Sequence, residues 1–162
     1  MSTAFSRTSP ERGLSTPESA LRWRHRARVA EAMVLLVAAR ALVAGVSFRH
    51  WRGWFGEVAA TPGQDRLDEA AALRARRVGR AVSQAARHLP LHCQCLPQAM
   101  AASWMLRRRA IPSEIVFGVL DSGRRGTPDD LHAWARCGGY TIAGEGEPVH
   151  NPVLVLTRMV KK

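Results

Sequence analysis

Residues 95–99 read Cys-Leu-Pro-Gln-Ala, and residues 132–134 read His-Ala-Trp. The first stretch is typical of a cysteine at the start of a helix, where the helix dipole and unpaired backbone N–H groups favour a thiolate. The second is typical of a histidine on a β-strand. A nearby imidazole can take the thiol proton and later protonate a leaving amine. We therefore predict that Cys95 and His132 form a Cys–His pair of the kind used in acyl transfer.

The chain ahead of Cys95 is patterned as helices. Long helices are predicted from about residue 15 to Ala44 and from about Gln64 to His88, because apolar side chains recur mainly at spacings of three, four or seven. Residues 46–55 are predicted to form a short helix whose two tryptophans anchor the core. A further helix over about residues 96–109 follows the cysteine and buries its small and apolar side chains.

Beyond residue 110 the pattern changes to that of strands, rich in Ile, Val and Phe or alternating in polarity. Strands are predicted over residues 113–120, 131–137, 140–143 and 149–156, with Gly138-Gly139 as a hairpin turn. Helices first and a small antiparallel sheet last predict an α+β fold. In that fold the helix that begins at the cysteine packs on the sheet.

Length and composition fit a single domain, since the chain has 162 residues of which 46% are hydrophobic. Residues 1–14 are polar and are predicted to be a disordered lead-in. The domain is predicted over residues 15–162. Its first part, residues 15–90, is mainly helical, and residues 91–162 hold the cysteine-bearing helix and the sheet.

A Cys–His pair is usually completed by a polar group that holds the imidazole in the useful tautomer. A two-residue turn at Gly138-Gly139 places Cys137 opposite Tyr140, and counting back along both strands places Glu145 opposite His132. Glu145 is therefore the predicted third member of the site. A register change of one residue would place a glycine there instead.

Four further residues are candidates for smaller parts in the site. Asp130 and Glu147 are reserves for the orienting carboxylate. Gln98 lies one helical turn after the cysteine, where its side chain can approach the substrate or the oxyanion, beside the backbone N–H of the cysteine. Trp134 shares a strand face with the histidine, so it either shields the imidazole from water or belongs to the core.

Charge is the unusual property of the composition. The chain has 24 Lys and Arg against 13 Asp and Glu, a formal net charge of +11. Such a charge implies attraction to nucleic acid, an anionic membrane surface, an acidic peptide or an acidic protein. The arginine runs at residues 74–77 and 107–109 fit solvated helix faces, and they also fit a dedicated binding patch.

Three cysteines exclude a fully paired set of disulfides within the chain, and no apolar segment typical of a signal peptide follows the N-terminus. A reducing cytoplasm is therefore the expected location. The apolar stretch Ala32–Phe48 is interrupted by Arg40, so we expect a buried or peripherally docked helix rather than a membrane span. No metal or other cofactor is expected.

Four segments carry a resemblance to a known family when they occur in this order: residues 95–99, the helix end at residues 105–109, the strand at residues 111–119, and residues 132–134. Over about residues 20–145 the chain resembles the lasso-peptide biosynthesis B2 proteins, which are leader peptidases of the transglutaminase-like superfamily. The resemblance implies a transglutaminase-like or papain-like core, with Cys95 as nucleophile and His132 as general base and acid.

The resemblance also implies partners. The substrate would be a ribosomally made lasso-peptide precursor in a bacterial cytoplasm, and a separate ATP-dependent lasso cyclase would close the freed core peptide. Because few residues precede the first long helix, the chain resembles the split form of the family. A separate small leader-binding recognition protein is then the expected partner, with the basic surface available for docking.

The chain departs from the family pattern at one position. The family has an aspartate shortly after the histidine, whereas residues 143–145 here read Ala-Gly-Glu and no aspartate lies downstream of His132. Either Glu145 substitutes for it, or the orienting group comes from elsewhere, or the site is a weakened dyad.

Two alternative functions stay open. A non-catalytic scaffold of the same maturation complex is favoured by the missing aspartate. A zinc-stabilised nucleic-acid-binding protein is suggested by the basic charge and by a cluster of possible ligands, His88, His92, Cys93 and Cys95. The one-residue spacing between the two cysteines of that cluster matches zinc modules poorly.

Overall fold

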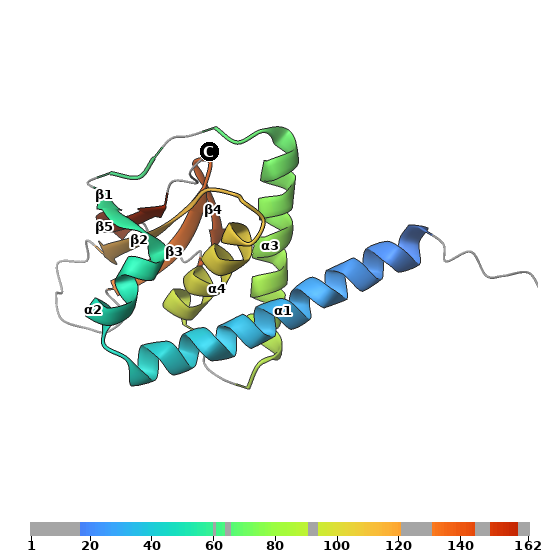
Figure 1. The fold of residues 1–162 in the computed structure, drawn as a ribbon, viewed down its shortest axis with the longest axis horizontal. Coiled ribbons are helices and arrows are strands. Elements are labelled where there is room, and N and C mark those ends of the chain that lie inside the picture. The colour runs from blue at the N-terminus through green and yellow to red at the C-terminus, as the bar shows by residue number, and fades with distance from the viewer. Residues whose placement is uncertain are drawn as a thin grey trace, which may run out of the picture.

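The computed structural model describes residues 17–59, 61–63, 66–90, 94–120, 131–144 and 150–158. The predicted α+β architecture is confirmed, because helices pack on a five-stranded antiparallel sheet, of which four strands follow the last helix (Figure 1). The predicted lead-in over residues 1–14 and the polar segment 121–130 lie outside the described residues.

The helical elements are α1 (Pro17–Gly45), α2 (Phe48–Trp51), the 3-10 helix η1 (Arg52–Phe55), α3 (Glu69–His88) and α4 (Cys95–Arg107). Each predicted helix is present, but α3 begins later than predicted. Asp68 is the reason, because its carboxylate accepts a hydrogen bond from the Ala71 N–H at 2.6 Å and so caps the helix there.

The prediction that both tryptophans of the short helix anchor the core is half wrong. Trp51 is buried at 2% exposure, whereas Trp54 is 55% exposed. Phe55 of η1 is buried in its place, and its ring stacks on Trp104 with centroids 5.4 Å apart. Residue type alone selected the wrong aromatic side chain, because Trp54 and Phe55 are both large and apolar.

The strands are β1 (Glu57–Ala59), β2 (Ser113–Leu120), β3 (Leu131–Cys137), β4 (Tyr140–Ala143) and β5 (His150–Arg158), in the order β1-β5-β2-β3-β4. The bounds of β2, β3 and β4 agree with the prediction, and β5 is displaced by one or two residues. The sequence analysis missed β1, which has only three residues, none of them buried. So short a segment carries no usable alternation.

The core lies between the sheet and a helical layer formed by α1, α3 and α4 (Figure 1). The predicted burial of the Ala32–Phe48 stretch is confirmed for its first half, where Ala32, Leu36 and Ala39 are fully buried. Burial of a side chain such as Leu36 contributes about 1.5–3 kcal/mol. A bidentate ion pair from Arg109 to Glu31, with its shorter contact at 2.6 Å, ties the end of α4 to α1.

Among the described residues, none of the helices has the length and apolar character needed to cross a bilayer.

Candidate active site

Cys95 is the first residue of α4, as the sequence predicted. Its side chain is half-buried, and the Gln94 side chain at the N-cap makes no capping hydrogen bond to the helix. The thiol therefore lies at a helix start whose backbone N–H groups receive no side-chain cap from Gln94. Pro97 is tolerated in this first turn because its missing N–H would have no helical partner there.

The connection after α4 brings the start of β3 to the end of the molecule where α4 begins. Ser113, the first residue of β2, lies beside Ser103 of α4, with 3.4 Å between the hydroxyl oxygens. From there β2 runs back along α4, and Gly118 near its end pairs with His132 of β3. Chain connectivity thus places Cys95 and His132 at one end of the helix and sheet layers.

The imidazole of His132 is held by the backbone. Its Nε2 is hydrogen-bonded to the carbonyl oxygen of Gly144, just after β4. A carbonyl only accepts hydrogen bonds, so Nε2 carries the proton and Nδ1 of the neutral ring keeps its lone pair. This tautomer is the one in which Nδ1 can act as a base.

Two further rings stack beside His132. The Trp134 ring lies with its centroid 5.9 Å away at 25°, and the His150 ring from β5 lies 4.8 Å away, also at 25°. Gly118 leaves the room for them, because a Cβ on that residue would lie 2.6 Å from the Trp134 ring. The predicted sharing of one strand face by His132 and Trp134 is confirmed.

Sequence reasoning missed His150. This residue pairs with Leu120 of β2, and it reaches His132 across that intervening strand. No local pattern connects residues 132 and 150, because their proximity depends on β5 lying beside β2 instead of at the edge of the sheet. The strand order is the only signal that would have found it.

The hairpin register differs from the predicted one. Cys137 pairs with Tyr140 as expected, but beyond Thr141 a β-bulge places Ala143 opposite Ala135, one residue out of the predicted register. At the bulge α3 lies close against β4, since a Cβ on Gly79 would overlap the Ile142 carbonyl oxygen.

The predicted orienting residue Glu145 lies outside the described residues. So do the reserve candidates Asp130 and Glu147, and His92 and Cys93 of the proposed zinc cluster. The count that placed Glu145 opposite His132 assumed a regular ladder, and the bulge overturns that assumption. In the described part of the chain the group bound to the imidazole is the Gly144 carbonyl.

Strand alternation separates His132 from the helix-facing surface of the sheet. Ala135 and Cys137 belong to the core beneath α4, whereas His132 and Trp134 point to the opposite face. Within the described residues, the hydrogen bond of the imidazole goes to Gly144 and not to Cys95. The thiol and the ring therefore share one end of the domain without being joined in this structure.

Two further residues, Gln98 and Cys137, lie in or beneath α4. Gln98 is half-buried one turn after Cys95, as predicted. Cys137 lies at the far end of β3, where burial raises the pKa of its thiol to about 11 and its Sγ donates to the Pro112 carbonyl at 2.9 Å. A thiol so protected is unsuited to nucleophilic attack.

Among the described residues, no group of three His, Cys, Asp or Glu side chains is arranged to hold a metal ion.

A model of the transglutaminase-like superfamily matches residues 33–156, more than half of the chain, and this range contains both Cys95 and His132. Comparison with curated proteins and comparison with solved structures each find no match. The order of elements, with a helix that begins at a cysteine followed by an antiparallel sheet that carries a histidine, agrees with that match. The chain therefore belongs to the transglutaminase-like superfamily, which includes cysteine peptidases.

Proposed function

We propose that the protein is a cysteine peptidase that removes the leader peptide from a ribosomally made lasso-peptide precursor. The observation that carries the proposal is the position of Cys95. It begins α4 at the end of the domain where the Gly144 carbonyl fixes the tautomer of His132. Membership of a superfamily that includes cysteine peptidases supports the chemistry, and the resemblance to lasso-peptide B2 proteins supports the substrate.

The proposed reaction has two steps. The Cys95 thiol gives its proton to Nδ1 of His132, and the sulfur attacks the scissile carbonyl while the imidazolium protonates the leaving amine. Water then attacks the thioester, with the imidazole as base, and releases the leader acid and the thiol. The reaction requires Nδ1 and Sγ to come together around the end of the sheet when substrate binds, because the thiol and the ring are not joined in this structure.

In this proposal the Gly144 carbonyl takes the positioning role that an aspartate has in the family pattern. It holds the imidazole ring and its tautomer, but it carries no full charge to stabilise the imidazolium. Loss of the carboxylate of a catalytic triad costs less than loss of the nucleophile or base. We therefore propose an active dyad with a backbone positioning group, and Glu145 is dispensable.

The proposed partners follow from the substrate. A separate small recognition protein would bind the leader, and a cyclase would close the freed core peptide, all in the cytoplasm. The proposed domain covers residues 15–162. In the described residues the positive charge on α1 and α3 supports docking to an acidic partner.

The test is cleavage of the cognate precursor peptide, followed by mass spectrometry, with and without the leader-binding protein. The wild type is expected to yield one leader-length fragment. Cys95→Ala and His132→Ala are expected to yield none, because each removes a reacting group. Glu145→Gln is expected to cut at nearly the wild-type rate, and a large loss in that variant would assign the orienting role to the carboxylate.

Two results would overturn the peptidase proposal. One is a folded wild type that cuts nothing even with the leader-binding protein present, which would favour the scaffold. The other is cleavage that persists in Cys95→Ala. Far-UV circular dichroism of each variant separates loss of chemistry from loss of fold.

A further inference from the structure

A groove of about 1200 Å³ lies between the N-terminal half of α1, the length of α3 and the edge strand β4. Seven arginines line it, three from α1 and four from α3, together with His25, and no Asp or Glu is among its lining residues. Figure 1 shows the blue N-terminal half of α1 extending past α3, away from the sheet.

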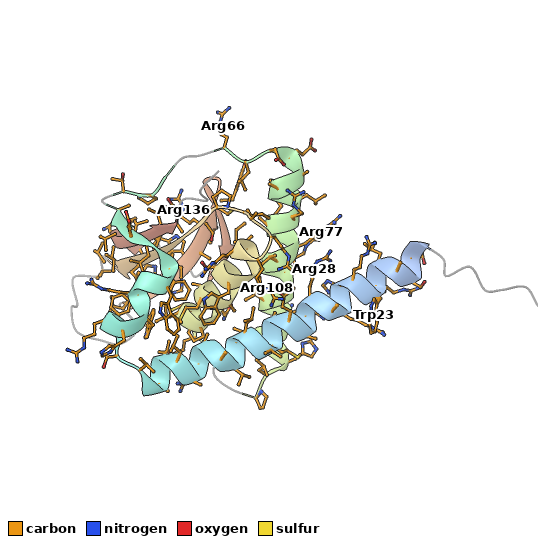
Figure 2. All side chains as sticks on the ribbon, in the orientation of Figure 1. Trp23, Arg28, Arg66, Arg77, Arg108 and Arg136 are labelled. Carbon is orange, nitrogen blue, oxygen red and sulfur yellow. The ribbon has the colours of Figure 1, made fainter. Side chains whose placement is uncertain are left out.

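The arginines of the groove are poorly neutralised. Of the ion pairs within the described residues, one involves a groove arginine, Arg22, and its partner Glu18 is 82% exposed. Figure 2 shows Arg28 and Arg77 in the angle between α1 and α3. Burial, followed by the charges of Arg77 and other nearby arginines, lowers the pKa of Arg28. Like charges are thus held together by the fold, an arrangement that a bound anion would relieve.

The floor of the groove is partly apolar. Leu21 of α1 and Leu73 of α3 are 57% and 44% exposed, and Ile142 of β4 is also a lining residue. Arginines and exposed leucines together suit a ligand that has both carboxylates and apolar side chains. Nucleic acid fits less well, because no Trp, Tyr or Phe is among the lining residues, and the neighbouring Tyr140 ring already has the Arg76 guanidinium over it, 5.4 Å from its centroid.

The spacing of the arginines along α3 indicates the length of the ligand that fits the groove. Arg76, Arg80 and Arg87 recur at intervals of four and seven along one face of α3. Eleven residues of helix span about 16 Å, which is about three helical turns. The guanidinium groups therefore form a row long enough for a short segment of polypeptide.

From this geometry we propose that the groove is a docking site for an acidic, amphipathic polypeptide segment of about three helical turns from a partner protein. Carboxylates of the segment pair with the arginine rows of α1 and α3, and its apolar side chains cover Leu21 and Leu73. The inference does not rest on the proposed peptidase activity, because binding to the groove is measurable without any cleavage.

The test uses the full chain and a fluorescent 14-residue peptide of Glu and Leu with leucines on one helical face. Fluorescence anisotropy is expected to show saturable binding that weakens as salt is added. The groove variant Arg26→Glu, Arg80→Glu, Arg87→Glu is expected to weaken binding by about tenfold or more, because it reverses charge on both walls. A peptide with serines in place of the leucines is expected to bind several-fold more weakly.

The matched control is Arg40→Glu, Arg49→Glu, Arg52→Glu, which changes the net charge equally at exposed positions outside the groove. It is expected to change binding by less than about threefold, since screened charges act over roughly 8–10 Å. Equal losses in both triple variants would overturn the proposal, as would absence of saturable binding. An oligothymidine that competes for the groove as tightly as the peptide would assign the site to nucleic acid.

Discussion

Cys95 and Cys137 lie at opposite ends of the same pair of layers, and their surroundings give them opposite properties. Cys95 is half-buried at the start of α4. Cys137 ends β3, is 2% exposed, and has its Sγ hydrogen-bonded to the Pro112 carbonyl. The Cys95 thiol is partly accessible at a helix start, whereas burial of the Cys137 thiol raises its pKa and opposes its ionisation. Position in the fold, and not residue type, decides which cysteine can react.

The largest expected difference between Cys95 and Cys137 is in the rate of precursor cleavage. Cys95→Ala is expected to lower precursor cleavage by about 10³-fold or more, because it removes the nucleophile. Cys137→Ala is expected to keep the wild-type rate within about threefold, while loss of one buried hydrogen bond and a small volume costs about 1–2 kcal/mol of stability. Initial cleavage rates with the two variants check this. A comparable loss of activity in both would break the comparison.

Thiol modification gives the next largest difference. In the native protein at pH 7.5, iodoacetamide is expected to modify Cys95 at least about 10²-fold faster than Cys137, since only an accessible thiolate reacts. Peptide mass spectrometry at timed intervals measures both rates in a Cys93→Ser background. In concentrated urea the two rates are expected to converge. Rapid native labelling of Cys137 would contradict its burial.

Glycine substitution compares the hairpin turn with the end of the sheet near His132. Gly139 and Gly144 have nearly the same φ, 82° and 83°, but a Cβ on Gly139 meets open space whereas one on Gly144 lies 2.5 Å from the Ala133 carbonyl oxygen. Gly139→Ala is expected to cost about 1 kcal/mol, and Gly144→Ala about 2–4 kcal/mol, in urea unfolding.

The same pair of variants tests the positioning role of the Gly144 carbonyl. Because Gly144→Ala displaces that carbonyl, it is expected to lower the cleavage rate and to change its dependence on pH, under conditions where the variant is folded. Gly139→Ala is expected to leave both unchanged. If the pH dependence of the cleavage rate is unchanged in Gly144→Ala, the Gly144 carbonyl has no positioning role in the mechanism.

The smallest expected effect is alkaline destabilisation through Cys137. Burial raises its pKa from 9.0 to about 11 in the folded state, so the unfolded thiol ionises first as pH rises. The stability that this thiol contributes is therefore complete below pH 9.0 and is lost as pH rises to about 11. Urea midpoints measured from pH 8 to 11 are expected to fall more steeply in the wild type than in Cys137→Ala. Parallel curves would show that the burial has no such effect.

The sequence predicted the elements around the site better than their three-dimensional relations. The bounds of β2, β3 and β4 and the start of α4 were readable, because alternation and helical spacing are local properties. The bulge at Ile142 was not, since it reflects the close approach of α3 to β4. The burial of Phe55 instead of Trp54 was missed for a similar reason, because it depends on which ring packs against Trp104 of α4.

The candidate site divides in the same way. Cys95 and His132 were identifiable from their motifs, since each is marked by its immediate neighbours in the chain. The Gly144 carbonyl and the His150 ring were not identifiable, because a backbone oxygen has no sequence signature and β5 reaches β2 only through the strand order.

The sequence by itself determined the α+β class, the helix that begins at Cys95, the strand that carries His132 and the excess of positive charge. Tertiary structure decided what holds the imidazole, which thiol is buried, and where seven arginines gather between α1 and α3. The physical reason is that helix and strand periodicity arise from neighbouring residues, whereas burial, stacking and charge clustering arise between segments far apart in the chain.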